Sequence, residues 1–312
     1  MQVFHIPINA LQKEETRHGT YDFPLALYET CVQKNVLGFV HWHWHDELQF
    51  CYVTQGVVEF YLNQQIYTLS AGDGIFINST FLHMVKDQGQ TEGTYLCLDF
   101  AVKMLSSFSG SLIEQKYVRP YVGNPMLSCC VFPSALPHNK PILDGFLHLV
   151  SLLETKDFGY EIDVYTTLLS LWKMILAESK IRGIHKKSTP SVTNTRLITL
   201  LSYLDQHYAE QIELAHLATL VNLSTSECCR LFKKVMNCTI FDYLFQLKLK
   251  KSMELLMESD CSIGQIALDT GFGSSSYYID RFHQTVGVTP NNYRTLHHNK
   301  VKDTKKNTPI LA

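Results

Sequence analysis

Apolar residues recur at helical spacing twice within residues 212–294, and the two copies share one layout. Corresponding positions lie 49 or 50 residues apart, so that Ala218 in the first copy matches Ala267 in the second. A small alanine lets the next helix cross closely. Asn222 and Gly271 stand where the connecting turn needs a residue that tolerates left-handed geometry. The pattern therefore predicts a duplicated helix-turn-helix.

One longer helix is predicted between the two copies, over residues 239–258, because its apolar positions share a face. In the first copy, Ser224 is placed to cap the recognition helix that follows it, with Glu227 three residues on as its capping-box partner. A helix of 20 residues extends roughly 30 Å, against roughly 34 Å for one turn of B-DNA. Two recognition helices held that far apart fit successive major grooves on one face of a duplex.

Between residues 23 and 100 the apolar pattern changes to a period of two, which is typical of strands. Short runs rich in β-branched and aromatic residues alternate with turn residues such as Gly56 and Gly72. The runs are residues 25–32, 47–54, 57–62, 65–69, 74–77 and 94–100. Many short strands at this spacing predict a sandwich or a small barrel.

Two helical patterns follow a proline-rich stretch, at residues 142–155 and 162–181. They could pack on the strand domain or against the same pair in a second chain, and the sequence leaves both open. The chain as a whole is predicted to be an α+β multidomain protein. Its expected parts are an N-terminal arm at residues 1–20, a sensing domain at 21–140, a helical dimerisation pair at 141–182, a linker at 183–194, a DNA-binding domain at 195–298 and a basic tail at 299–312.

The composition, with 46% hydrophobic and 18% charged residues, is that of a globular protein. A net charge of −2 gives no global support for nucleic-acid binding, but Arg230, Lys233 and Lys234 cluster on the first recognition helix. The nine cysteines lack CxxC spacing, which indicates reduced thiols in a cytoplasm. We expect neither a secretory signal nor a membrane span, because the start is not basic and apolar runs are short.

The second copy contains Ile263-Gly-Gln-Ile-Ala-Leu-Asp-Thr-Gly-Phe and Gly287-Val-Thr-Pro-Asn-Asn-Tyr-Arg, and it resembles the signature of AraC/XylS transcriptional regulators. The first copy is similar but looser, because Asn222 stands where that family usually has Gly and Cys228 where it usually has a large apolar residue. The resemblance implies a cupin-like N-terminal barrel that senses a small molecule and a C-terminal domain that binds promoter DNA. Activation is the commoner role in that family.

Exposed positions near the start of each recognition helix are expected to reach base edges. Arg230 is the best candidate for a bidentate contact to guanine, whereas Asp280 occupies the matching position of the second copy. Lys233, Lys234 and Lys248 are predicted to contact phosphates, which gives affinity and salt dependence rather than sequence choice. The predicted DNA-binding residues are Thr225, Ser226, Glu227, Arg230, Lys233, Lys234, Lys248, Ser274, Ser275, Ser276, Tyr277 and Arg281.

His43 and His45, separated by one residue, are similar to the first metal-binding motif of cupins, and His83 resembles the histidine of the second. Alternate residues of a strand share a face, so both members of the pair can point inward. The acidic ligand position holds the amide Gln49, whereas a shift by two residues would use Glu47. Three histidines could hold zinc or iron, or border a pocket as polar groups. We expect the second arrangement, an effector pocket that holds neither a metal nor a cofactor. The predicted pocket residues are Tyr28, His43, His45, Glu47, Gln49 and His83.

Two function classes compete for this chain. One is a homodimeric, effector-controlled regulator that binds double-stranded promoter DNA and contacts RNA polymerase. The other is a metal-dependent cupin enzyme, a dioxygenase or an isomerase, with an accessory helical domain. The duplicated helix-turn-helix is hard to explain in an enzyme, and the missing acidic ligand is hard to explain in a metal enzyme. The sequence therefore favours a cytoplasmic transcriptional activator without catalytic residues.

Overall fold

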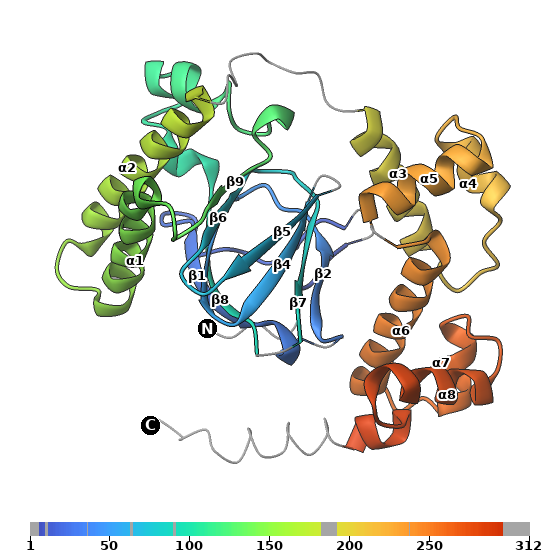
Figure 1. Cartoon of the computed structure of the whole chain (residues 1–312). Helices are drawn as coiled ribbons and strands as arrows, with labels where there is room; N and C mark the ends of the chain where they lie inside the picture. Colours follow the sequence, from blue (N-terminus) through green and yellow to red (C-terminus); the bar gives the residue numbers. More distant parts are fainter. Residues whose placement is uncertain are drawn as a thin grey trace. The chain divides into compact units, whose positions relative to one another are not determined.

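The computed structural model describes residues 6–9, 12–35, 37–62, 65–89, 92–181, 192–236 and 238–295 (Figure 1). The chain divides into two compact units, Met1–Ile198 and Thr199–Ala312. Most of the expected linker, residues 183–191, and the whole basic tail at 299–312 lie outside the described residues. The helix after the linker begins at Val192.

Two antiparallel sheets form the first unit. The five-stranded sheet has the order β1 (Leu25–Cys31), β8 (Thr94–Phe100), β3 (Leu48–Gln55), β6 (Gly74–Ile77) and β9 (Cys129–Phe132). The four-stranded sheet has the order β2 (Phe39–His43), β7 (His83–Asp87), β4 (Val57–Leu62) and β5 (Gln65–Ser70). All six predicted runs form strands, which confirms the β-rich domain. The strands hydrogen-bond as two sheets rather than as one closed barrel, and the predicted runs did not include β2, β7 and β9.

Short helical segments connect the strands and precede the long helices. They are η1 (Val32–Lys34), η2 (Val102–Leu105), the π-helical η3 (Glu114–Val118), η4 (Pro125–Leu127) and η5 (Pro137–Asn139). Two prolines of the proline-rich stretch before the long helices begin two of these segments, η4 and η5. A proline at the first helical position loses no hydrogen bond, which explains these starts.

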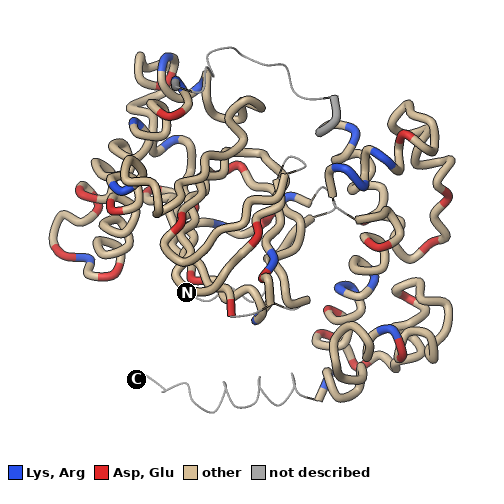
Figure 2. The backbone as a smooth tube through the Cα atoms, viewed as in Figure 1, with Lys and Arg blue, Asp and Glu red and all other residues tan. Residues whose placement is uncertain are grey.

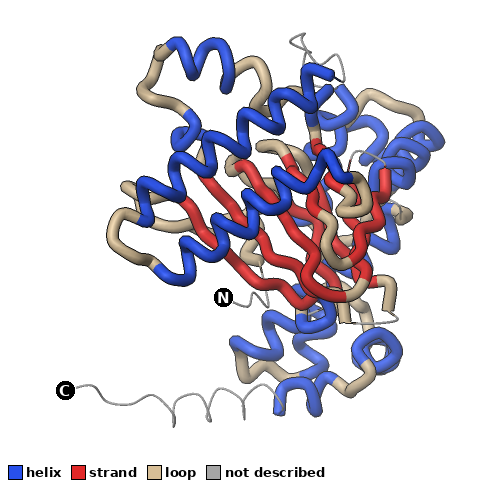
Figure 3. Tube along the Cα trace, turned by 60° about the vertical axis from the view of Figure 1, so that its left-hand side comes forward, coloured by secondary structure: helices blue, strands red, loops and turns tan. Residues whose placement is uncertain are grey.

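Helices α1 (Lys140–Thr155) and α2 (Tyr160–Ile181) lie side by side across one sheet (Figure 3). Phe146 of α1 stacks on Phe50 of the five-stranded sheet with ring centroids 4.8 Å apart. Trp172 of α2 lies 5.9 Å from Phe76 of the same sheet. Of the two arrangements left open by the sequence, the helical pair therefore packs on its own strand domain, and its outer face exposes Ile162.

A second apolar core fills the space between the two sheets. Phe60 and Val58 of β4 meet Val53 and Ile75 of the opposite sheet, and these side chains are fully buried. Burial of this kind is the main favourable term in folding, at about 25 cal/mol per Å² of apolar surface. The same interlayer space also holds a group of buried polar side chains, which make up the site described below.

The second unit contains the predicted pair of helix-turn-helix motifs. Its helices are the part of α3 (Val192–Gln206) that follows Ile198, α4 (Leu214–Leu220), α5 (Thr225–Met236), α6 (Ile240–Glu258), α7 (Ile263–Asp269) and α8 (Ser275–Val286). Helices α4 and α5 form the first motif, α7 and α8 form the second, and α6 is the single helix predicted between them. Thr239 caps α6 in a capping box with Asp242, so the helix starts where its sequence signal stands.

The turns of both motifs have the predicted backbone geometry. Asn222 has φ 53° and Gly271 has φ 72°, both in the left-handed region. In the first motif, Ser224 donates its backbone N–H and its hydroxyl to the Glu227 carboxylate at 2.9 and 2.6 Å. In the second motif the turn also packs tightly, because a Cβ on Gly271 would lie 2.7 Å from Cα of Ala209. Gly271 is thus required by close approach as well as by its φ.

We predict that Gly271→Ala destabilises the second unit by far more than Gly273→Ala. Both positions have positive φ, so each substitution costs roughly 1–2 kcal/mol of backbone strain. Only at Gly271 does the new methyl group also meet backbone atoms, whereas nothing lies within 4 Å of the Cβ position at Gly273. Urea unfolding of the full-length variants measures the difference. Equal losses of stability would show that the contact with Ala209 does not constrain the turn.

Candidate functional site

A cavity of about 500 Å³ lies between the two sheets of the first unit. Strands of both sheets and residues that precede β1 contribute its walls. Four of the predicted pocket residues line it, namely Tyr28, His43, Gln49 and His83. His45 lies behind this wall against the His83 ring, with ring centroids 5.2 Å apart, and Glu47 is half-buried outside the lining. A volume of this size suits a small ligand.

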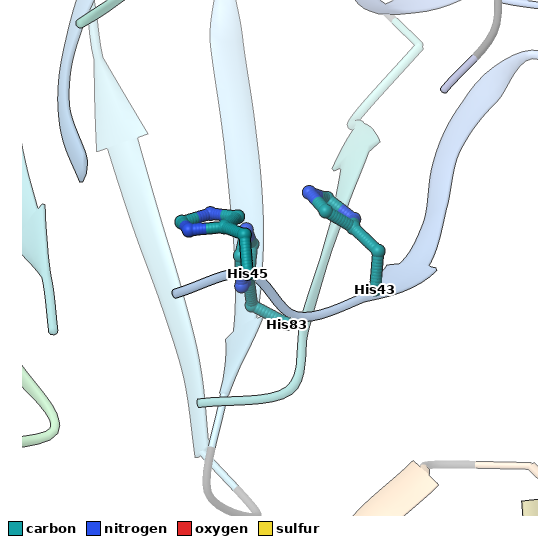
Figure 4. A group of neighbouring side chains, drawn as sticks. All are labelled: His43, His45 and His83. Carbon is teal, nitrogen blue, oxygen red and sulfur yellow. The ribbon is translucent and has the colours of Figure 1, made fainter. Parts of the chain in front are cut away.

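Three of these residues, His43, His45 and His83, form a compact group that we call the histidine cluster (Figure 4). His43 ends β2 and pairs with His83 at the start of β7, while His45 follows two residues after β2. One ring nitrogen from each lies within 4.8 Å of the others, and all three side chains are buried. Burial lowers the pKa of His83 to about 4 and holds the pKa values of His43 and His45 well below the usual range.

The residues before β1, which we expected to form an arm, supply part of the site instead. Residues 12–18, the N-terminal segment, run beside the loop after β2, because Glu14 N–H donates to the Trp44 carbonyl at 2.8 Å and Trp44 N–H donates to the Gln12 carbonyl at 2.9 Å. This places the Glu14 carboxylate 3.9 Å from Nε2 of His43 and 3.6 Å from Nε2 of His18. Sequence reasoning missed Glu14 and His18, since the segment is polar and has no periodicity.

Asp99 of β8 joins this buried group from the other sheet. Its carboxylate accepts from the Gln49 amide at 3.0 Å and lies 3.6 Å from Nδ1 of His18, which also lies 3.1 Å from the Tyr28 hydroxyl. Burial raises the pKa of Asp99 to about 7, and burial together with the Asp99 charge raises that of Glu14 to about 8. Burial lowers the pKa of His18 to about 4. Near neutral pH His18 is therefore neutral, Glu14 is mostly protonated and Asp99 is close to its midpoint, so the group carries less charge than the same side chains would in water.

The predicted base-contacting residues lie on exposed surfaces of the second unit. In α5, Thr225, Ser226 and Arg230 are exposed, while Phe232 is buried against the core. Lys233 and Lys234 are exposed in the last turn of the same helix, and Figure 2 shows the basic positions of this unit. Glu227 is exposed as well, but its carboxylate is engaged in capping α5, so its part in base contact is restricted.

Helix α8 presents a less basic surface than α5. Its predicted contact residues are exposed, namely Ser274, Ser275, Ser276 and Tyr277. The Ser274 hydroxyl accepts from the Tyr277 N–H at 3.3 Å and so caps the helix. Asp280, which matches Arg230 of the first motif, is exposed too. The surface offers hydroxyls and a phenol ring rather than cations.

Two predicted DNA contacts have structural partners. The Lys248 ammonium, expected to meet a phosphate, donates to the Gly271 carbonyl at 2.7 Å, which ties α6 to the turn of the second motif. The Arg281 guanidinium lies over the Phe245 ring, 4.4 Å from its centroid, and its Nε is buried. Lys248 thus ties α6 to the turn of the second motif, and Arg281 ties α8 to α6, so both side chains also help to hold the second motif in place.

Comparison with known proteins identifies the two units. Residues 28–171 match the family described as an AraC-like ligand binding domain, and residues 217–295 match a helix-turn-helix domain. Over 286 residues the chain is 32% identical to the HTH-type transcriptional regulator YdeC of Bacillus subtilis, which covers 91% of this chain and 96% of that protein. The chain belongs to the AraC family of transcriptional regulators. The resemblance stated from the second helix-turn-helix copy is thereby confirmed.

Other AraC-family relatives align over most of the chain. It is 26% identical to the transcriptional activator RhaS of Klebsiella pneumoniae over 257 residues, covering 81% of this chain and 86% of RhaS. It is 23% identical to the melibiose operon regulatory protein of Escherichia coli over 257 residues, covering 81% and 83%. Like other AraC-family members, the chain is a DNA-binding transcriptional regulator with an N-terminal ligand-binding domain. Within the described residues no helix has the length and apolar character needed to cross a membrane.

Proposed function

We propose that this AraC-family regulator is an effector-controlled transcriptional activator. The observation that carries the proposal is the cavity of about 500 Å³ inside the ligand-binding domain, with buried polar groups on its walls. A relative of similar length, RhaS, is named as an activator, which supports the direction of control. The competing enzyme hypothesis gains no support from the relatives, which are regulators.

The walls of the cavity favour a small, partly polar effector. Val40 and Val85 provide apolar surface, and Tyr28 and Arg17 place hydrogen-bond donors on the lining. The Asn35 amide nitrogen donates to the Cys31 and Val32 carbonyls, so Asn35 offers its amide oxygen as an acceptor. Pockets that combine apolar walls with a few fixed polar groups bury most of a small ligand and orient it. Tyr28 and Asn35 are therefore the residues we expect to select the effector.

Control of transcription requires that the effector bind two states of the chain unequally. We infer that its occupancy of the cavity shifts an equilibrium between domain or dimer arrangements, and so changes how the recognition helices meet promoter DNA. The exposed apolar side chains of Leu147 on α1, Ile162 on α2 and Phe158 in the loop between them support a homodimer contact. We further propose that the chain acts in the cytoplasm and contacts RNA polymerase at the promoter.

The two recognition helices are proposed to divide their work. Helix α5 supplies base contact through Arg230 and phosphate contact through Lys233 and Lys234, because all three side chains are exposed and cationic. Helix α8 reads DNA through hydroxyls, with Ser275 and Ser276 exposed at its start. The first motif therefore provides most of the electrostatic affinity, and the second positions the domain.

We predict that Arg230→Ala lowers the affinity for an operator by roughly 1–3 kcal/mol, or about 5- to 150-fold, because a bidentate contact to guanine is lost. Operators recovered by chromatin pull-down of the full chain provide the probe. The matched control is Lys234→Ala, which should weaken specific and non-specific binding alike and lower the salt slope by about one. If Arg230→Ala left the ratio of specific to non-specific affinity unchanged, the assignment of base contact to α5 would be wrong.

We predict that compounds bound in the cavity stabilise the full-length chain, by about 2.7 kcal/mol at 100 times the dissociation constant. Such compounds are found by thermal shift. The variant Thr30→Phe fills the cavity wall from β1 and should abolish their effect, whereas Thr68→Phe adds the same ring at an exposed position of β5 and should not. Binders that change melting temperature but leave transcription and operator footprint unaltered would contradict the sensing proposal.

A further inference from the structure

The histidine cluster has its ring nitrogens arranged in one consistent way. Nδ1 of His43 lies 2.8 Å from the His41 carbonyl, Nδ1 of His45 lies 3.1 Å from the Glu47 carbonyl, and Nδ1 of His83 lies 2.9 Å from the Phe81 carbonyl. A carbonyl oxygen can only accept, so each Nδ1 carries the proton and donates it. Each neutral ring therefore keeps its lone pair on Nε2. Histidines that bind metals are commonly fixed by this same kind of contact through their second nitrogen.

Two of the three Nε2 atoms of the cluster are buried without a hydrogen-bond partner among the described residues. Nε2 of His45 and Nε2 of His83 make no hydrogen bond with any described residue, although the side chains are only 2% and 1% exposed. An unsatisfied buried polar atom costs roughly 1–3 kcal/mol. Two unsatisfied imidazoles beside a third, His43, whose Nε2 lies 3.9 Å from the Glu14 carboxylate, indicate a ligand that accepts electron pairs from all three rings.

We propose that the histidine cluster and the Glu14 carboxylate together bind one divalent transition-metal ion. Glu14 is the nearest carboxylate to the cluster for which a contact is seen, since its Oε2 lies 3.9 Å from Nε2 of His43. Gln49 occupies the position at which the sequence suggested an acidic ligand, and its amide is used by Asp99 at 3.0 Å. The carboxylate missing from β3 is therefore supplied by the N-terminal segment. This departs from the expectation of a metal-free pocket.

The donor set defines the class of ion. Three imidazole nitrogens and one carboxylate oxygen suit zinc and its neighbours, such as cobalt and nickel, rather than calcium or magnesium. Ligand atoms around tetrahedral zinc lie about 3.4 Å apart, compared with separations of up to 4.8 Å within the cluster and 3.9 Å to Glu14. Small rotations of the rings close this difference. Binding displaces a proton from Glu14 to solvent, because the ligand must be ionised.

Such an ion would also fasten the N-terminal segment to the sheets. The segment is otherwise joined to this region by the backbone hydrogen bonds between Glu14, Gln12 and Trp44, and by a surface ion pair between Lys13 and Asp46. Because Glu14, Thr16 and Arg17 line the cavity, a metal bond to Glu14 fixes one wall of the effector site. The inference concerns metal binding and holds whether or not an effector controls transcription.

The test is a titration of the chelator-treated full-length chain with cobalt chloride and zinc sulfate. We expect one ion per chain, a visible cobalt spectrum without thiolate bands, and a rise in melting temperature with metal concentration. Glu14→Gln removes a direct ligand and should weaken binding by at least about 10-fold, the lower end of the loss seen for mere outer-shell partners, and His83→Gln should abolish stoichiometric binding. His148→Gln removes an exposed histidine of α1 and should bind as the wild type does.

Each outcome decides the proposal. If the wild-type chain takes up far less than one ion, or if His83→Gln and His148→Gln bind alike, there is no metal site in the cluster. If His83→Gln loses the ion but Glu14→Gln binds it as tightly as the wild type does, the histidines alone hold the ion. The proposed ligand role of Glu14 in the N-terminal segment would then be wrong. Should His83→Gln fail to fold by circular dichroism, the wild-type stoichiometry and Glu14→Gln still decide. Failure of metal binding would leave the effector response, measured by thermal shift and footprint, untouched.

Discussion

The ligand-binding domain depends on keeping a group of titratable side chains away from water between two sheets. Histidines, two carboxylates and an amide meet there, and burial shifts the pKa values of the histidines and carboxylates toward their neutral forms. Buried polar groups are tolerated only with partners, so the geometry of the site is set by which partners reach which atoms. The N-terminal segment belongs to this arrangement, because it lies outside both sheets and yet brings Glu14 to the cavity wall and His18 into contact with Glu14 and Asp99.

The DNA-binding domain follows a different constraint, which is close packing of short helices. Gly271 approaches Ala209 so closely that no side chain fits at this position. The Lys248 ammonium of α6 donates a hydrogen bond to the carbonyl of the same glycine. The second helix-turn-helix is thus built for fixed geometry, with Arg281 stacked on Phe245. The first helix-turn-helix keeps its cations free on α5, where Arg230 is exposed. Rigid scaffold and basic surface therefore reside mainly in different copies of one duplicated motif.

Local signals explain why the fold could be predicted. Helix caps, turn residues and helical periodicity predicted both helix-turn-helix motifs, and alternating apolar positions predicted the β-rich domain. Both predictions were possible because each signal is contained within a few consecutive residues. The site was predicted only in part. His43 and His83 follow from their motifs, but Glu14 reaches them through backbone hydrogen bonds to Trp44, a contact that no local pattern encodes. The contact of Lys248 with the Gly271 carbonyl was not predicted for the same reason, since its partner is distant in sequence.

The central claim is that the N-terminal segment completes the ligand site by bringing a carboxylate to three buried imidazoles. Anomalous diffraction at the zinc edge, from crystals of the zinc-loaded full-length chain, tests it most directly. The account predicts one peak among His43, His45 and His83, at roughly 2.0–2.2 Å from their ring nitrogens and from a carboxylate oxygen of Glu14. A structure with the ion elsewhere, or with Glu14 turned away and residues 12–18 displaced from the cavity, would contradict it.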